Sequence, residues 1–199
     1  MPKSYDRSYF DRWYRDPRKR VKVEDDVMRK VRLVVGIAEY YLERPLRSVL
    51  DVGCGEGAWR PLLKRIRPSL RYQGVDASEY AVQRFGRRRN IRLGTVGGLR
   101  DLKLKGPYDL VVCCDVMHYV PSDELARGVR EMGRLAGGLA YLEAFTTEDA
   151  VVGDKDSWQN RTPAWYRRLF ASNGFSPVGS QCYVTPGVLE MVSALEGAT

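Results

Sequence analysis

The sequence lacks the features of a membrane or secreted protein. No apolar run approaches the roughly 18 residues that a membrane span needs. The N-terminus, from Met1 to Arg7, is charged and has no apolar signal core. We therefore expect no membrane association and a cytoplasmic location.

Metal ligands are also scarce. The chain has one histidine, and its four cysteines form no C-x-x-C pair. A zinc site of the usual kind needs several such ligands, so no metal is expected. Cys113 and Cys114 stand together in an apolar run, where neighbouring side chains point to opposite faces. We expect all four thiols to be reduced and structural.

Length and composition are those of one globular domain. The 199 residues are 44% hydrophobic and 29% charged, and a chain of this length buries enough surface to fold without disulfides. We expect an N-terminal helical cap segment over 1–46 and a main domain over 47–199, together forming one compact unit. Its expected state is a monomer or a homodimer.

Positive charge is concentrated in the first two thirds of the chain. Residues 1–136 hold 29 Lys and Arg against 18 Asp and Glu, whereas residues 137–199 hold 4 against 7, giving +11 and −3. Two basic clusters, 18–22 and 84–92, could attract nucleic acid. Neither cluster contains the interleaved aromatic residues of a base-stacking surface. Solvated helix faces and loops are therefore the favoured interpretation.

From Arg47 onward, short apolar runs alternate with amphipathic stretches, which is typical of α/β proteins. The pattern predicts a seven-stranded, mostly parallel sheet. The expected strands are 47–52, 71–76, 90–94, 108–114, 138–145, 175–184 and 188–194. Only Thr185-Pro186-Gly187 separates the last two strands, which predicts an antiparallel C-terminal hairpin.

Capping residues mark three helices between these strands. Ser78 is expected to begin one helix, and the acids after Ser122 to begin another. Thr162-Pro163 should begin a third, which Asn173-Gly174 ends.

Residues 1–46 are predicted to be helical. An apolar stripe runs from Val27 to Ala38 at helical spacing. Ahead of it, aromatic side chains recur every few residues, namely Tyr5, Tyr9, Phe10, Trp13 and Tyr14. They could form a lid over a site or anchor the segment on the sheet. We favour anchoring, because aromatic stripes at helical spacing more often serve packing.

The stretch Val49 to Gly57 carries the strongest functional signal. An apolar run ends in Asp51, and glycines follow at positions 53, 55 and 57. Glycine lets the backbone turn tightly and lets a ligand approach closely. The dinucleotide fingerprint G-x-G-x-x-G needs its third glycine one position later, so a different small molecule is indicated.

Polar residues at two further strand ends support a ligand site. Asp76 follows Gly57 by nineteen positions, where a carboxylate can accept hydrogen bonds from the vicinal hydroxyls of a ribose. The strand 108–114 is followed by Asp115 and His118. The carboxyl ends of neighbouring parallel strands meet in one crevice, so we expect these groups to converge.

The chain resembles the class I S-adenosylmethionine-dependent methyltransferases, which have a three-layer Rossmann-like α/β fold. The resemblance covers about residues 45–195 and rests on four segments: 49–57, 74–78, 108–120 and 138–145. It implies that Asp51, Gly53 and Gly55 border the methionine part of S-adenosylmethionine, and that Asp76 holds its ribose. The full set of implied cofactor-binding residues is Asp51, Gly53, Gly55, Asp76, Ala77, Thr95, Val96 and Asp115.

One motif departs from the family pattern. The family often has Gly-Asp-Ala after the third strand, whereas this chain has Gly94-Thr95-Val96. The Thr95 hydroxyl could bond the exocyclic amine of adenine, with Val96 packing on the ring.

The chemistry of the residues agrees with this resemblance. Asp51 and Asp115 place negative charge near the bound ligand. This charge would attract a sulfonium cofactor and repel the phosphates of a dinucleotide. His118, whose ordinary pKa lies near neutrality, is the candidate general base or acceptor-orienting group; a wall residue is the alternative. Tyr119, Glu143 and Trp158 are the expected substrate-facing residues, with 145–161 as a candidate lid. Trp158 could equally anchor that loop.

The expected function is methyl transfer to a small organic acceptor, through a hydroxyl or an amine. One alternative is an RNA or protein methyltransferase that uses the basic N-terminal and 84–92 patches. Another is a non-catalytic module that only binds the cofactor. The single domain has no spare module for RNA, and its acidic C-terminal third is expected to face the acceptor, so a small molecule is favoured.

Overall fold

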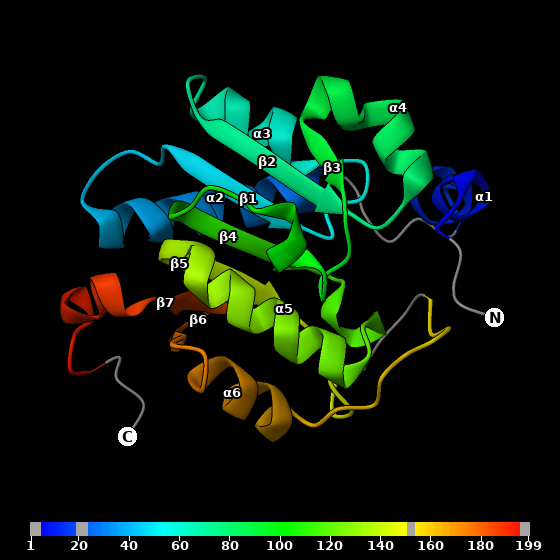
Figure 1. Ribbon diagram of the computed structural model, residues 1–199. Helices are drawn as coiled ribbons and strands as arrows, with labels where there is room; N and C mark the ends of the chain where they lie inside the picture. The colour runs from blue at the N-terminus through cyan, green and yellow to red at the C-terminus, as the bar shows by residue number, and fades with distance from the viewer. Residues whose placement is uncertain (1–4, 19–23, 151–153, 196–199) are drawn as a thin grey trace.

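The protein is described by a computed structural model covering residues 5–18, 24–150 and 154–195 (Figure 1). Its strands are β1 (Ser48–Val52), β2 (Arg71–Asp76), β3 (Ile91–Leu93), β4 (Tyr108–Cys114), β5 (Ala136–Glu143), β6 (Ser176–Gly179) and β7 (Cys182–Val184). Its α-helices are α1 (Arg7–Phe10), α2 (Glu24–Leu42), α3 (Trp59–Ile66), α4 (Glu79–Arg89), α5 (Ser122–Leu135) and α6 (Pro163–Ala171). A π-helical segment is η1 (Asp11–Arg15), and the 3-10 helices are η2 (Leu99–Leu102), η3 (Met117–Tyr119) and η4 (Pro186–Met191).

The strands form one seven-stranded sheet in the order β3-β2-β1-β4-β5-β7-β6. Neighbours from β3 to β5 pair in parallel, and β7 is antiparallel to both β5 and β6. The expected mostly parallel sheet with an antiparallel C-terminal hairpin is confirmed. The chain order reverses between β1 and β4, and such a switch point is where open α/β sheets bind ligands (Figure 1).

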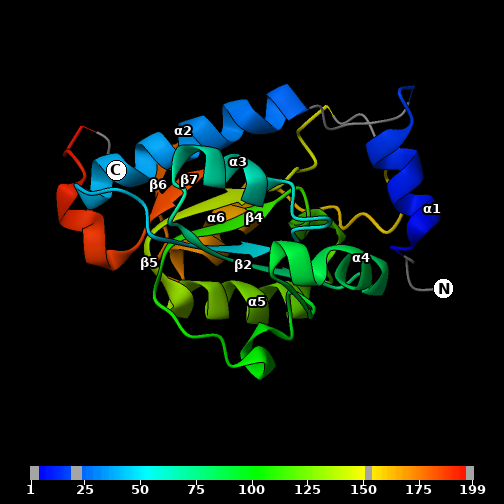
Figure 2. The ribbon, with the colours of Figure 1, turned by 90° about the horizontal axis from the view of Figure 1, so that it is seen from above.

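Helices cover both faces of the sheet, which gives the expected three layers (Figure 2). On one face, Val31, Val34 and Ala38 of α2 pack with Val49 of β1 and with α3. On the other face, α5 and α6 pack against Leu50 of β1 and alternate residues of β4 and β5. All five residues of β1 are buried, as parallel strands covered on both sides require. The proposed division of the chain at residue 46 stays a prediction.

The C-terminal strands differ from the prediction in position. The segment expected as one strand over 175–184 folds back at Ser180 and Gln181, whose φ angles are 49° and 61°, and so supplies both β6 and β7. Residues 188–194 are not a strand, because η4 occupies Pro186–Met191. Neither Ser180 nor Gln181 is a glycine or an asparagine. The sequence Thr185-Pro186-Gly187 therefore predicted a turn more strongly than the true turn did.

Three predicted helix starts are confirmed. The Ser78 hydroxyl accepts a hydrogen bond from the Ala81 amide at the start of α4. Thr162 caps α6 in the same way, with Pro163 in its first turn. The helix expected after Ser122 is α5. Helix α3 was not expected from the sequence, because it begins after Ala58 without any side-chain cap.

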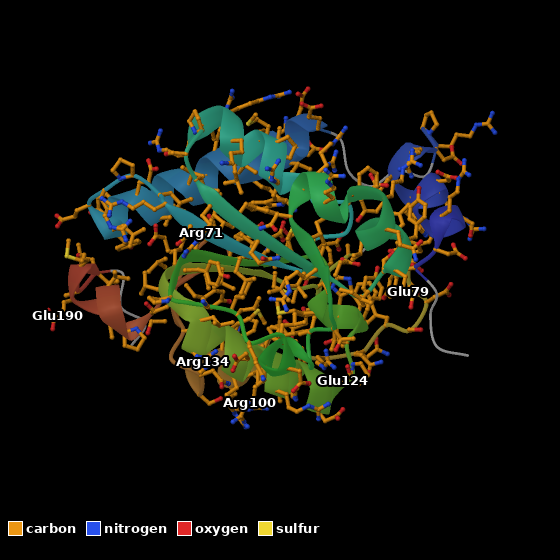
Figure 3. All side chains as sticks on the ribbon, turned by 45° about the horizontal axis from the view of Figure 1, so that its top comes forward. Arg71, Glu79, Arg100, Glu124, Arg134 and Glu190 are labelled. Carbon is orange, nitrogen blue, oxygen red and sulfur yellow. The ribbon has the colours of Figure 1, made fainter. Side chains whose placement is uncertain are left out.

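The surface carries the charged side chains. Arg71, Arg100 and Arg134 project from the periphery of the molecule (Figure 3). In the basic cluster 84–92, Arg87 and Arg88 are exposed, and Arg89 donates to the Glu56 carbonyl at 2.5 Å. Most of the other cluster, 19–22, lies outside the described residues. No helix in the described part of the chain is long and apolar enough to cross a bilayer. All four cysteines are free.

Two glycines that lie within helices allow the effect of packing on stability to be measured apart from the effect of helix propensity. A β-carbon on Gly128 of α5 would lie 2.6 Å from the Val96 carbonyl oxygen, whereas one on Gly36 of α2 would meet nothing within 4 Å. We predict that Gly128→Ala lowers the free energy of unfolding by about 1–3 kcal/mol through overpacking. Gly36→Ala should raise it by about 0.5–1 kcal/mol. Denaturant titration measures both, and equal shifts of one sign would contradict this packing.

Candidate active site

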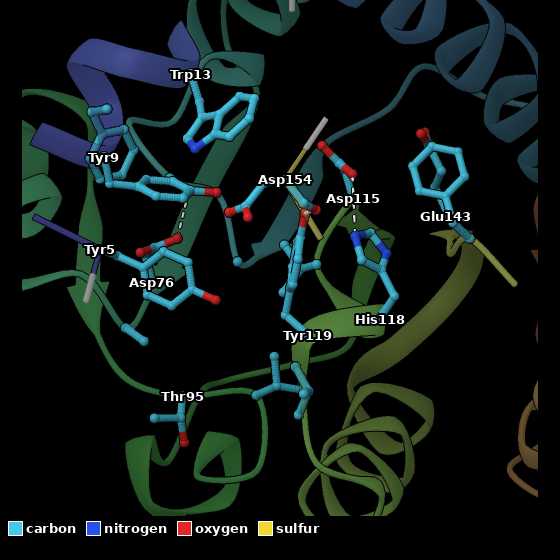
Figure 4. A pocket seen from close by; sticks show the side chains of 18 of the residues that line it. Tyr5, Tyr9, Trp13, Asp76, Thr95, Asp115, His118, Tyr119, Glu143 and Asp154 are labelled. Atoms are coloured by element: carbon cyan, nitrogen blue, oxygen red, sulfur yellow. Dashed lines mark hydrogen bonds and ion pairs between the residues drawn. The ribbon is translucent and has the colours of Figure 1, made fainter. Parts of the chain in front are cut away.

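A cavity of about 360 Å³ opens at the carboxyl ends of the central strands (Figure 4). Ten of the twelve predicted site residues line it: Gly53, Gly55, Asp76, Ala77, Thr95, Val96, Asp115, His118, Tyr119 and Glu143. The convergence of these strand ends in one crevice is confirmed. Asp51 and Trp158 are the two that do not line it.

The glycine loop after β1 forms the floor of this cavity. Gly53, Gly55 and Gly57 have φ angles of 70°, 55° and 70°, in the left-handed region that favours glycine. A β-carbon on Gly53 would lie 2.5 Å from a Val116 methyl, and one on Gly55 would lie 2.8 Å from the Tyr14 hydroxyl. The loop therefore exposes bare backbone to the cavity, as the sequence predicted.

Asp76, at the end of β2, is held by the loops on either side of it. The Gly55 amide donates to Asp76 Oδ2 at 2.6 Å, and the Ser78 amide donates to Oδ1 at 2.8 Å. Each carboxylate oxygen has more than one lone pair, so these bonds orient the group and leave further acceptor capacity. The side chain faces the cavity (Figure 4).

Asp51 lies beside the main cavity rather than in its lining, and its contact with the methionine part of the cofactor stays a prediction. It is buried, accepts a hydrogen bond from the Tyr72 hydroxyl at 2.7 Å, and lines a smaller cavity of about 60 Å³. Strand side chains alternate between faces, and Asp51 shares the face of Val49 and Tyr72. The smaller cavity shares Gly53 and Lys30 with the main one.

Asp115 and His118 follow β4 and face each other. Asp115 has a φ of 62°, and its Oδ1 lies 3.6 Å from His118 Nε2 (Figure 4). The imidazole is 1% exposed and is surrounded by aromatic rings, with centroid distances of 4.2 Å to Tyr119, 4.8 Å to Trp158 and 5.3 Å to Phe145. A buried histidine beside a carboxylate is arranged to accept or hold a proton.

Trp158 is not among the residues that line the cavity, and its contact with a substrate stays a prediction. Its ring packs on His118 at an interplanar angle of 32°, and the next residue, Gln159, donates its amide to the His118 carbonyl at 2.8 Å. Trp158 therefore supports the histidine. In the same loop, Phe145 and Asp154 do line the cavity.

Glu143, at the end of β5, is ion-paired within the cavity wall. Lys30 of α2 lies 2.7 and 2.6 Å from the two carboxylate oxygens, and the Tyr141 hydroxyl donates at 2.5 Å. Burial alone would raise the pKa of Glu143, but the bonds from Lys30 and Tyr141 hold that pKa below its ordinary value. Glu143 is thus a charged, fully engaged group. The sequence analysis missed Lys30, which no motif marks.

The aromatic N-terminal segment, residues 5–15, closes one side of the cavity. Tyr5, Tyr9, Phe10, Trp13 and Tyr14 all line it. The segment is anchored on the glycine loop after β1 and on the start of α4. The Ser78 hydroxyl donates to the Tyr5 carbonyl, Phe10 packs on Tyr80, and Arg15 pairs with Glu56. The segment therefore forms one wall of the cavity, and its role as a lid or as an anchor stays a prediction.

Thr95 and Val96, the two residues of the third motif, have different surroundings. Thr95 Oγ1 accepts a hydrogen bond from the Gly98 amide at 3.0 Å, so this hydroxyl closes a turn. Val96 is buried against Gly128 of α5 and presents an apolar surface to the cavity. This end of the cavity is suited to a flat apolar ring.

Arg161 is a buried residue beside the site that no sequence motif marks. It is buried and donates to the Met117 carbonyl at 3.0 Å, to the Val120 carbonyl and to Ser122 Oγ. Its guanidinium also stacks over Trp165 at 4.6 Å. Arg161 thus fixes the segment 117–122, which carries His118. An arginine between two loops gives no periodic signal in sequence.

This fold and this site resemble those of the class I S-adenosylmethionine-dependent methyltransferases. The methyltransferase domain family matches residues 49–137, which confirms the resemblance seen in the sequence. The chain is 40% identical over 93 residues to a trans-aconitate 2-methyltransferase of Mycobacterium tuberculosis. That match covers 46% of the chain and 34% of the relative, so the chain spans about a third of the length of the curated relatives it matches.

Solved structures share the whole fold. Magnesium protoporphyrin IX methyltransferase from Synechocystis PCC 6803, with bound S-adenosylhomocysteine, superimposes with a TM-score of 0.60 at 20% identity. That alignment covers 91% of this chain and 96% of the other. The sugar N-methyltransferase KedS8 from Streptoalloteichus superimposes with a TM-score of 0.61 at 17% identity, covering 82% and 93%. At these identities the likeness shows the fold.

Removal of Arg161 should loosen the segment that carries His118. We predict that Arg161→Met lowers the free energy of unfolding by about 1–3 kcal/mol, because buried carbonyls lose their donors. The exposed Arg167 gives the control, and Arg167→Met should stay within about 0.5 kcal/mol of the parent. Denaturant titration compares the two variants. Matching stabilities would show that Arg161 does not hold this segment.

Proposed function

We propose that the protein transfers a methyl group from S-adenosylmethionine to a small organic acceptor, through a hydroxyl or an amine. The observation that carries this proposal is the shared cavity: the glycine loop, Asp76, Asp115 and His118 meet around one space of about 360 Å³. That volume lies within the roughly 300–1,000 Å³ of small-molecule pockets.

The residues fit the methyl donor. The bare backbone of the Gly53–Gly55 turn leaves room for close approach, and Asp76 is oriented to accept from ribose hydroxyls. Val96 offers an apolar face for adenine. The donor supplies a methyl group already activated on a sulfonium. The task left to the protein is to exclude water and to hold the acceptor in line.

The acceptor end is formed by His118, Tyr119, Phe145 and the N-terminal aromatic wall. His118 can take a proton from a hydroxyl or an ammonium as the acceptor reacts. Asp115, 3.6 Å from the imidazole, stabilises the imidazolium that forms. Burial keeps water away from these groups. The relatives support methyl transfer to small molecules but differ in the acceptor: trans-aconitate offers only carboxylates, whereas KedS8 is named for a sugar nitrogen, as in the amine acceptor proposed here.

Donor binding tests the first part of this proposal. S-adenosylhomocysteine should bind the protein, and Asp76→Asn should weaken that binding by about tenfold or more, because a charged acceptor is lost. The exposed Asp101 gives the matched control, and Asp101→Asn should bind as the parent does. Titration calorimetry measures all three. No binding to the parent protein would refute the proposal, including its non-catalytic alternative.

His118 tests the catalytic part. We predict that His118→Gln lowers turnover by about a hundredfold or more, with S-adenosylhomocysteine affinity nearly unchanged, because the proton acceptor is lost and the donor site is kept. Initial rates come from an acceptor methylated in a panel of small alcohols and amines. Unchanged turnover would make His118 a wall residue.

A non-catalytic binding module would bind S-adenosylhomocysteine and methylate nothing in that panel. An RNA or protein methyltransferase would use the exposed arginines of 84–92, none of which is among the residues that line the cavity. Steeply salt-dependent retention of RNA would favour the latter function.

A further inference from the structure

The cavity lining has a strong excess of negative charge. Five carboxylates line it among the described residues, namely Asp76, Asp115, Glu124, Glu143 and Asp154, against the single lysine Lys30. Lys30 binds both oxygens of Glu143, at 2.7 and 2.6 Å, so its charge is already matched. In the described part of the chain, the lining therefore offers no cation that is free of an acidic partner to receive an anionic acceptor.

Three of the five carboxylates have other tasks or places. Asp76 serves the proposed ribose position, and Glu143 is paired with Lys30. Glu124 is on the first turn of α5 beside Gly97, at the end near Thr95 and toward the periphery (Figure 3). The other two carboxylates are Asp115, which lies beside His118, and Asp154, which lines the cavity from the loop after β5.

Asp154 lies between aromatic residues on two sides of the cavity. Its backbone carbonyl accepts from the Tyr119 hydroxyl at 2.8 Å, and its Oδ1 accepts from the Asp156 amide at 3.0 Å, so its position is fixed. Figure 4 shows it between Trp13 and Tyr119. Burial, together with Asp76 and Asp154, raises the pKa of Tyr5 to about 12. The Tyr5 phenol is therefore neutral near pH 7, and the carboxylates among the described lining residues outnumber the one lysine.

Aromatic faces and a carboxylate together are the chemistry that recognises an organic cation. Trp13, Tyr119 and Phe145 supply ring surfaces, which attract an ammonium through their quadrupoles. A carboxylate on the acceptor would instead approach Asp115 and Asp154 and be repelled. A neutral alcohol would gain nothing from either charge.

We propose that the acceptor is an amine that enters the cavity as an ammonium and is held by Asp154 and the surrounding aromatic rings. This inference rests on the methyl-transfer function proposed above and names its substrate class. It excludes acceptors that present a carboxylate to this part of the site.

The reaction balances with the groups present. The ammonium gives one proton to His118, which frees the nitrogen lone pair. The nitrogen then forms a bond to the methyl carbon as the carbon–sulfur bond breaks, and that electron pair stays on sulfur. The products are S-adenosylhomocysteine and the methylated amine, which carries the positive charge. The proton on His118 passes to solvent when the product leaves.

Matched ring compounds test this proposal on the intact protein. Benzylamine, benzyl alcohol and benzoate have the same ring and differ in charge. Each is titrated into protein saturated with S-adenosylhomocysteine, with binding followed by ligand-observed NMR. We expect benzylamine to bind at least tenfold more tightly than the other two, with affinity that falls as salt increases. Asp154→Asn should remove the preference, and Asp156→Asn, on an exposed residue of the same loop, should keep it.

The outcomes separate the two proposals. If S-adenosylhomocysteine does not bind, the methyl-transfer function fails before any probe is added. If it binds and benzoate or benzyl alcohol binds as well as benzylamine, or benzylamine does not bind, the amine proposal is overturned and methyl transfer stands. A folded Asp154→Asn protein that keeps the amine preference also overturns it, and its melting temperature shows that it is folded.

Discussion

The Asp76 carboxylate, fixed by the amides of Gly55 and Ser78, is the interaction on which the site depends. It joins the glycine loop after β1 to the start of α4, two segments that only the pairing of β1 with β2 brings together. Because both amides point at one carboxylate, the loop is held with its backbone toward the cavity. The same segments anchor the N-terminal wall, through Ser78 and Glu56.

The opposite side of the cavity is built by a different means. The segment 117–122 follows β4 and is held by the buried Arg161. The guanidinium of Arg161 donates hydrogen bonds to carbonyls of this segment, and leaving a buried carbonyl without a donor would lower stability. Trp158 and Phe145 pack around His118 from the same loop. One wall is thus set by sheet pairing and the other by a long loop. Donor and acceptor recognition are divided between them in the proposed function.

Local chemistry explains which features the sequence could predict. Glycines with left-handed backbone, a serine cap and an acid at a strand end act within a few residues, so the glycine loop, Ser78 and Asp76 were placed correctly. Strand alternation turns Asp51 toward Tyr72 and out of the main cavity lining, which the sequence did not reveal. Lys30, Asp154 and Arg161 act through contacts between distant segments, and no periodic pattern marks them. The C-terminal turn also has neither glycine nor asparagine at its two left-handed positions, Ser180 and Gln181.

A crystal structure of the protein with S-adenosylhomocysteine tests the central claim most directly. We predict that both ribose hydroxyls bond to the Asp76 carboxylate, that adenine lies on Val96, and that the sulfur faces Asp115 and His118. The space beyond the sulfur should then be bounded by Asp154, Tyr119 and the N-terminal aromatic wall. A ligand seated elsewhere, or with its ribose away from Asp76, would contradict this account.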